Sequence, residues 1–168
     1  KPIGVMRNYL LGDPQSKDCA THMIWENPLE QDKIKAKPSL GDTALPERVR
    51  IATVQFQMRR INSIDEFEQQ IEYFTDIASD YKADFVVFPE LFTLQLLSLE
   101  HKPLGPVESI EKISEYTPRF VEFVEKLAVS YNINIIAGTH PSRVENGDIL
   151  NISYVFLRDG SVHTQQKL

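Results

Sequence analysis

The sequence predicts an α/β domain in which helices pack on a mixed β-sheet. Short runs of β-branched residues alternate with two longer segments whose apolar residues recur at helical spacing. Two tight-turn dipeptides, Asn146-Gly147 and Asp159-Gly160, flank a further strand at residues 152–157 and indicate hairpins. Strands connected through helices usually pair in parallel, whereas hairpins pair antiparallel strands, so both kinds of pairing are expected in the sheet.

The first strand and helix are expected after residue 48. Residues 49–56 read VRIATVQF, and this β-branched run predicts a strand that is mostly buried on both faces. Ser63 and Glu66 match a capping box, so a helix is expected to begin at Ser63. This helix should carry one apolar stripe, formed by Ile64, Phe67, Ile71, Phe74, Ile77, Ala78 and Tyr81.

A second helix and two more strands follow. Residues 85–88 form a short apolar strand that should end at Pro89, because proline cannot donate to a sheet ladder. Thr117 as N-cap and Pro118 at the first helical position predict the helix. Residues 133–137 then predict another buried strand.

Composition divides the chain into three parts. Residues 28–47 contain prolines among charged and polar residues and little that could build a core, so they are expected to be a linker. Residues 1–27 are too short for an independent core. Residues 48–168 carry the regular pattern and are expected to form one domain.

Charge and hydropathy exclude several classes of partner. The formal net charge of −6 and the pI of about 5.2 argue against binding to nucleic acid or to anionic lipid. No apolar run approaches the roughly 20 residues that span a bilayer, and the first residues lack a signal-peptide pattern, so a cytoplasmic protein is expected. The single cysteine, Cys19, excludes an intramolecular disulfide.

The histidines do not form a metal-binding pattern. They are far apart and lie near no cysteine pair or carboxylate cluster, so neither a metal nor another cofactor is expected. His140 follows a strand that is expected to end at Gly138 and could line a pocket, although a structural loop histidine is the preferred interpretation. The four histidines are His22, His101, His140 and His163.

Glu90 occupies the position of a functional residue. In open α/β sheets, sites gather at the carboxyl ends of strands, and Glu90 directly follows the strand that ends at Pro89. Its neighbours Phe88, Leu91 and Phe92 are apolar. Partial desolvation is therefore expected to raise the pKa of its carboxyl group and to make it a better general base near neutral pH. The alternative is an ordinary surface glutamate on a loop.

Several motifs occur in the order found in one enzyme family. Residues 84–92 read DFVVFPELF, residues 132–139 read NINIIAGT, and residues 151–160 read NISYVFLRDG and lead to QKL at residues 166–168. With the strand and capped helix before them, these motifs resemble the first part of the nitrilase, or carbon–nitrogen hydrolase, superfamily. The resemblance covers about residues 48–168 and implies part of that family's four-layer αββα sandwich.

The resemblance implies a catalytic triad of glutamate, lysine and cysteine. The motifs map the glutamate onto Glu90 and the lysine onto Lys167, whereas the family's cysteine and its second, supporting glutamate would follow residue 168. Glu90 would generate the attacking thiolate, because a thiol with a pKa of about 8.5 is mostly protonated at neutral pH. Lys167 would stabilise the negative charge that builds on the substrate. Water activated by the same carboxylate would then hydrolyse a thioester.

Simpler interpretations stand beside this mapping. Without the family resemblance, Lys167 is an exposed lysine near a frayed terminus. Cys19 is a poor substitute for the missing nucleophile, because it precedes the linker and nothing in the sequence positions it near Glu90. It is interpreted as a small, half-buried residue. Residues 1–168 alone are therefore expected to be inactive.

The leading segment resembles a different family. Residues 4–9, GVMRNY, and residues 20–28, ATHMIWENP, are similar to the tail of a GNAT-type acetyltransferase domain, which some bacterial proteins fuse to a nitrilase-like domain. The resemblance implies that residues 1–27 are the last one or two strands of an upstream domain. The glycine-containing loop that binds acetyl-CoA in that family has no counterpart here.

Two functions follow as hypotheses. The first is a cysteine-dependent hydrolase of a small linear amide or nitrile, with an amide preferred, that forms a homo-oligomer when intact. The second is a non-catalytic fragment or binding module of an acetyltransferase–hydrolase fusion. A cysteine a few tens of residues after Lys167 in the natural protein would favour the first hypothesis.

Overall fold

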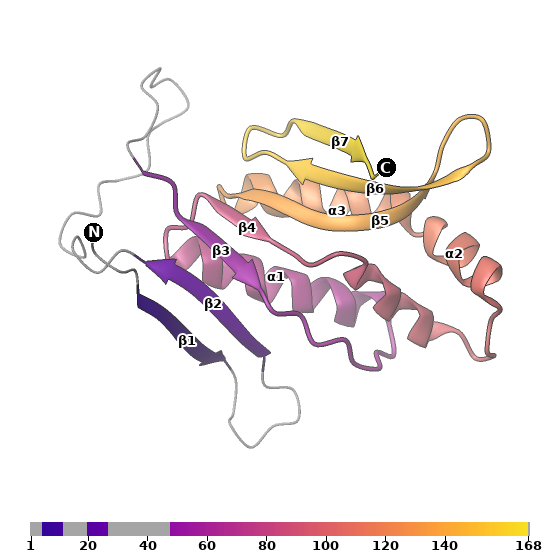
Figure 1. Ribbon diagram of the computed structural model, residues 1–168, viewed down its shortest axis with the longest axis horizontal. Coiled ribbons are helices and arrows are strands. Elements are labelled where there is room, and N and C mark those ends of the chain that lie inside the picture. The colour runs from indigo at the N-terminus through magenta and orange to yellow at the C-terminus, as the bar shows by residue number, and fades with distance from the viewer. Residues whose placement is uncertain (1–4, 12–19, 27–47, 168) are drawn as a thin grey trace.

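The computed structural model describes residues 5–11, 20–26 and 48–167 (Figure 1). These residues form one sheet in which the spatial order of the strands follows the chain. The strands are β1 (Val5–Leu11), β2 (Ala20–Glu26), β3 (Ile51–Val54), β4 (Phe85–Val87), β5 (Asn134–Arg143), β6 (Ile149–Phe156) and β7 (Val162–Gln166). The helices are α1 (Ile64–Asp80), α2 (Pro106–Ser114), α3 (Thr117–Ser130) and the 3-10 helix η2 (Phe92–Leu99).

The sheet is mixed, as the sequence predicts. Strands β3, β4 and β5 pair in parallel, and the connections between them contain the helices. The remaining neighbours pair antiparallel, including β2 with β3. Glycines with positive φ lie in both predicted hairpin turns, at Gly147 (φ 93°) and Gly160 (φ 89°). The α/β prediction is therefore confirmed.

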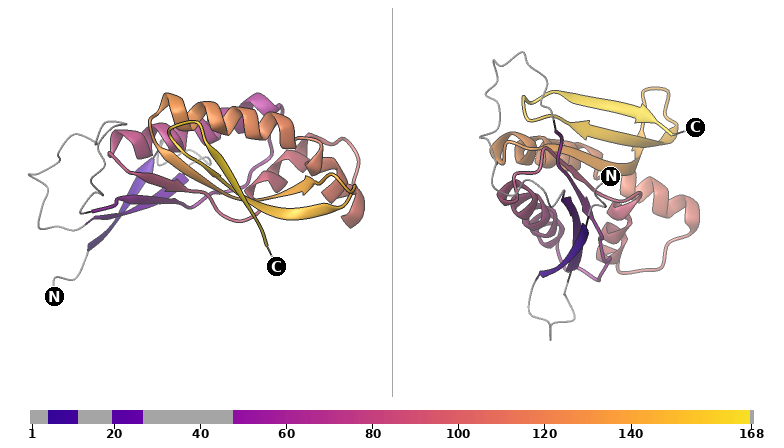
Figure 2. Two further views of the ribbon diagram at one scale, coloured as in Figure 1. Left: turned by 90° about the horizontal axis from the view of Figure 1, so that it is seen from above. Right: turned by 60° about the vertical axis from the view of Figure 1, so that its left-hand side comes forward.

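The helices lie on one face of the sheet (Figure 2). The apolar stripe of α1 faces this sheet, and Phe67 and Ile71 are buried as predicted. On β3 the burial alternates: Val54 is buried, whereas Ile51 is 45% exposed. The prediction that this strand is buried on both faces is therefore wrong, because the described residues supply a helical layer for only one face.

The starts of the two predicted helices differ in detail from the sequence prediction. The Ser63 side chain accepts the backbone N–H of Glu66, as in a capping box. The Glu66 carboxylate, however, accepts the N–H of Asn62 at 3.0 Å. Thr117 is the first residue of α3, and Tyr116 is the N-cap, so the predicted N-cap is wrong by one position. The Thr117 hydroxyl instead donates to the Ser114 carbonyl oxygen and contacts His140 Nε2.

Strand β5 is longer than the sequence predicts. It continues beyond Gly138 to Arg143, with a shift of register between Ile136 and Thr139. His140 consequently lies within a strand and is fully buried, not on a loop. The predicted strand end at Gly138 is therefore wrong, because this glycine accompanies an irregularity inside the strand.

No helix in the described ranges is both long and apolar enough to cross a membrane. The predicted linker at residues 28–47 and Cys19 lie outside the described residues. The assignments made for them remain predictions.

Candidate functional site

Glu90 is held at the carboxyl end of β4 by the neighbouring strand β5. It forms an isolated parallel bridge with Thr139, and the N–H of Leu91 donates to the Thr139 carbonyl oxygen at 3.1 Å. Gly138 permits this close approach. A Cβ atom at Gly138 would lie 2.0 Å from the carbonyl oxygen of Pro89, and its φ of +55° also favours glycine.

Lys167 reaches the same place from the end of β7. The pairing of β6 with β7 places Gln166 opposite Ile152, and the next N–H, that of Lys167, donates to the Asn151 carbonyl oxygen at 2.9 Å. The register of this hairpin therefore fixes where the Lys167 side chain begins. A tight Asp-Gly turn sets that register.

The Glu90 and Lys167 side chains form an ion pair. Lys167 Nζ donates to Glu90 Oε1 at 2.5 Å across 77 positions of sequence. Asn151 Nδ2 donates to the same oxygen at 3.5 Å. The two side chains are 49% and 52% exposed, so other groups have room to approach them. The structure thus brings together the two residues that the sequence singles out.

Asn151 was not assigned a role from the sequence. It stands at the start of one of the motifs on which the family resemblance rests, but its position in a half-buried strand has no feature that separates it from a structural asparagine. The signal that identifies it is tertiary, namely its contact with Glu90.

The pKa of Glu90 is lowered, which corrects the sequence-based expectation. The hydrogen bond from Lys167 is the largest cause, followed by the positive charge of Lys167. Partial burial acts in the opposite direction and is weaker, and the bond from Asn151 lowers the pKa a little further. Desolvation is weak because Phe88 and Phe92 are buried in the core, where their rings stack 5.2 Å apart.

His140 has a structural role in this arrangement. Its Nδ1 lies 2.9 Å from Thr93 Oγ1 and its Nε2 lies 2.9 Å from Thr117 Oγ1, while its ring stacks on Phe120 at 4.9 Å. The Thr117 hydroxyl proton goes to the Ser114 carbonyl oxygen, so Nε2 must donate and Nδ1 accepts from Thr93. Burial lowers the pKa of His140 to about 4, which keeps the ring neutral.

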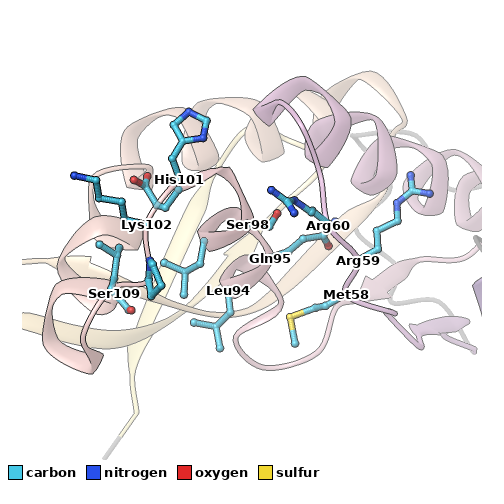
Figure 3. Close-up of a pocket in the computed structure, with 13 residues that line it drawn as sticks. Met58, Arg59, Arg60, Leu94, Gln95, Ser98, His101, Lys102 and Ser109 are labelled. Carbon is cyan, nitrogen blue, oxygen red and sulfur yellow. The ribbon is translucent and has the colours of Figure 1, made fainter.

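A separate groove of about 700 Å³ lies beside η2 (Figure 3). Its walls come from the segment after β3, from η2, from the loop that follows η2 and from Ser109 of α2, and neither Glu90 nor Lys167 lines it. Four of its lining side chains are basic, and Arg59, Arg60, His101 and Lys102 point in different directions and do not converge on one point (Figure 3). The groove therefore presents no single anion site.

The described residues hold no group of three or more His, Cys, Asp or Glu side chains that could bind a metal ion. The site consists of a carboxylate, an ammonium group and an amide. Such a set can accept a proton and stabilise a developing negative charge, but it requires a nucleophile from elsewhere.

Comparison with known proteins identifies the family. The carbon–nitrogen hydrolase family model matches residues 50–168. The chain is also 44% identical over 164 residues to a probable hydrolase of Bacillus subtilis (strain 168), YhcX, with 96% of this chain and 30% of that protein covered. The chain therefore spans about 30% of the length of this curated relative.

Solved structures share the fold. A carbon–nitrogen hydrolase from Helicobacter pylori superposes with a TM-score of 0.56 at 19% identity, over 71% of this chain and 39% of that one. Saccharomyces cerevisiae Nit3, a member of the nitrilase superfamily, superposes with a TM-score of 0.55 at 24% identity, over 71% of this chain and 44% of Nit3. An amidase from Nesterenkonia sp. superposes with a TM-score of 0.55 at 19% identity, over 71% of this chain and 42% of the amidase.

Proposed function

Because this chain belongs to the carbon–nitrogen hydrolase family, we propose that the protein hydrolyses a small linear amide or nitrile with a Glu–Lys–Cys triad. The contact between Glu90 Oε1 and Lys167 Nζ supports this proposal most directly, because it joins two motif residues that are distant in sequence. A cysteine in a segment after residue 168 would complete the triad. An amide is the preferred substrate class.

Glu90 serves as the general base in this proposal. Its carboxylate is ionised at neutral pH and can take a proton from the thiol, and the lowered pKa makes it a weaker base than an unpaired glutamate. The thiolate sulfur then bonds to the amide carbon, and the oxygen that gains negative charge is stabilised by the Lys167 ammonium group. Glu90 returns its proton to the departing amine, which leaves a thioester.

The second half of the reaction uses the same residues. Water loses a proton to Glu90 and attacks the thioester carbon, and Lys167 again stabilises the charged oxygen. The carbon–sulfur bond breaks, the thiolate recovers the proton from Glu90, and a carboxylic acid leaves. The net reaction consumes one amide and one water and releases an acid and an amine.

Amine or ammonia release by the natural full-length protein tests the proposal, with a panel of short linear amides and nitriles as substrates. We expect Glu90→Gln to lower kcat by about a hundredfold to ten-thousandfold, as for loss of a general base. Glu145→Gln, an exposed change in the β5–β6 hairpin, is the matched control. Mass spectrometry should detect an acyl group on a cysteine after residue 168. Full activity of Glu90→Gln, or no cysteine there, would refute the triad.

A second proposal concerns residues 1–27. The match to the Bacillus subtilis relative covers 164 residues, more than the family model does, so it includes much of the leading segment. We propose that this segment belongs to an acetyltransferase-like domain fused to the hydrolase. Calorimetric titration of the natural full-length protein with acetyl-CoA tests this, and absence of binding would leave the hydrolase function alone.

The cellular location and the assembly state are proposals as well. We propose a cytoplasmic homo-oligomer whose partner is a small-molecule substrate, without nucleic acid or membrane. Light scattering after size-exclusion chromatography of the natural full-length protein would give the number of subunits, and a monomer would contradict the proposed assembly.

A further inference from the structure

Asn151 touches both charged residues of the site. Its backbone carbonyl oxygen accepts the N–H of Lys167 at 2.9 Å, and its side-chain Nδ2 donates to Glu90 Oε1 at 3.5 Å. It lies on β6, partly buried, between the β5 edge that holds Glu90 and the β7 end that carries Lys167. No other described side chain contacts Glu90 through a hydrogen bond besides Lys167.

The bonding of the Asn151 amide differs from that of a structural asparagine. Asn134 on β5 provides the comparison: its Nδ2 donates to the Asp84 carbonyl oxygen at 2.9 Å, and its Oδ1 accepts the Arg158 N–H at 3.1 Å. Buried amides usually satisfy both ends in this way. Asn151 Oδ1, in contrast, is buried without a hydrogen-bond partner. Within the described part of the chain, the one side-chain hydrogen bond of Asn151 is therefore directed at Glu90.

The charge of Glu90 explains which way this amide points. If the Asn151 amide were turned over, its carbonyl oxygen would face the Glu90 carboxylate, and two acceptors would repel each other. The amide N–H faces Glu90 even though Oδ1 is then left unpaired, which costs free energy. A residue that bears this cost contributes to the site more than to the stability of the strand.

Both donors bind the same carboxylate oxygen. Lys167 and Asn151 contact Glu90 Oε1, and among the described residues Glu90 Oε2 accepts no hydrogen bond. Two donors on one oxygen fix the rotation of the carboxyl group and leave the second oxygen available. A base whose free oxygen has a fixed direction transfers protons more efficiently than one that rotates.

We propose that Asn151 is a positioning residue that holds Glu90 Oε1 against Lys167, so that Oε2 is the oxygen that accepts the proton. This inference rests on the proposed function, in which Glu90 is the general base. It assigns Asn151 no contact with the substrate.

Two side-chain changes test the role of Asn151, because the backbone bond to Lys167 survives both. Asn151→Ala removes the amide, and Asn151→Ser keeps a polar side chain too short to reach Glu90. In the natural full-length protein we expect kcat to fall about tenfold, as for loss of one hydrogen bond to a charged group, with KM within about twofold. Ser153→Ala, two positions along the same face of β6, is the matched control.

Titration supplies a readout that a purely structural role would not change. The acid limb of the pH profile of kcat/KM should move to higher pH in both variants, because a donor to the Glu90 carboxylate is lost. The ¹³C chemical shift of the Glu90 carboxyl carbon should report the same change, with Ser153→Ala unaltered. The Asn151→Ser variant decides the question if Asn151→Ala does not fold.

The two proposals fail in different ways. If Glu90 titrates at the same pH in the wild type and in both Asn151 variants, or if KM rises while kcat stays constant, the positioning role is refuted. If the wild-type protein hydrolyses no amide or nitrile, the proposed function is refuted. The ¹³C titration then still shows whether Asn151 interacts with Glu90.

Discussion

At the scale of single residues, the acidity of Glu90 depends on one partner. The carboxylate is half exposed, and its neighbours Phe88 and Phe92 are buried in the core. Lys167 supplies both the strongest hydrogen bond and the nearest positive charge. A base that is ionised at neutral pH can accept a proton at once, and its ammonium partner is already in place for the charge that forms next.

Loss of Lys167 should therefore raise the pKa of Glu90. In Lys167→Met we expect the ¹³C titration of the Glu90 carboxyl carbon to move up toward the ordinary glutamate value. Lys126→Met is the matched control, because Lys126 lowers the pKa of Glu122 on the surface of α3 in the same way. That control should shift Glu122 and leave Glu90 unchanged. An unshifted Glu90 in Lys167→Met would contradict the ion pair.

At the scale of secondary-structure elements, the site depends on how closely β4 approaches β5. Gly138 lies beneath the Pro89 carbonyl group with no space for a side chain and with a φ of +55°. The β5 backbone can therefore hold the segment that carries Glu90. The register shift in β5 and the position of Glu90 both accompany the close approach of Gly138 to Pro89.

Gly138→Ala should disturb this contact. We expect a loss of at least about 2 kcal/mol in the free energy of unfolding, from strain and from displacement of Pro89. Gly147→Ala is the control, because Gly147 also has a positive φ (93°) but no atom near the position of its missing Cβ. The Gly147→Ala substitution should lower the free energy of unfolding by about 1 kcal/mol. Urea denaturation measures both, and equal losses would show that the close contact with Pro89 is unimportant.

His140 links three elements, β5, η2 and α3, and should make stability depend on pH. Its folded pKa of about 4 lies below the ordinary value of 6.5. The unfolded chain therefore binds more protons between these pH values, so stability decreases as the pH falls through this range. The loss should reach about 3 kcal/mol at pH 4.

The His140→Gln variant isolates this effect. Carboxylates also contribute to acid sensitivity, but they contribute equally in both proteins. Urea denaturation between pH 4 and 7 should give a flatter dependence of the unfolding free energy on pH for His140→Gln than for the wild type. Identical slopes would show that the His140 ring can be protonated in the folded protein.

At the scale of the whole molecule, the described residues form one helical layer on one sheet. The opposite face of β3 exposes Ile51, and Val49 and Met58 on either side of the strand are 51% and 54% exposed. The family's sandwich would cover such a face with further layers. The chain spans less than half of each structural relative compared above.

Substitutions on the two faces of β3 test this organisation. In this 168-residue chain we expect Ile51→Thr to change the unfolding free energy by less than about 0.5 kcal/mol, because the side chain is already half exposed. Val54→Thr, on the helix-covered face, should cost about 1–2 kcal/mol, because it buries a hydroxyl group. In the natural full-length protein the cost of Ile51→Thr should increase. An unchanged cost there would show that this face stays exposed.

Local physics determined most of the elements from the sequence. The spacing of Phe67 and Ile71 predicts the buried side of α1, and the glycines at 147 and 160 predict the hairpin turns. Strand β4 ends at Val87, one residue earlier than the predicted strand 85–88. Each of these features depends on residues a few positions apart. The motifs also pointed to Glu90 and Lys167, because their order along the chain matches that of one family.

Only the tertiary structure decided how these residues interact. The lowered pKa of Glu90, the contact of Asn151 and the tautomer of His140 arise from groups 77, 61 and at least 23 positions away. The exposed face of β3 likewise depends on which layers cover the sheet. Electrostatic and packing energies depend on distance in space, and the sequence by itself does not contain that distance until the strands have paired.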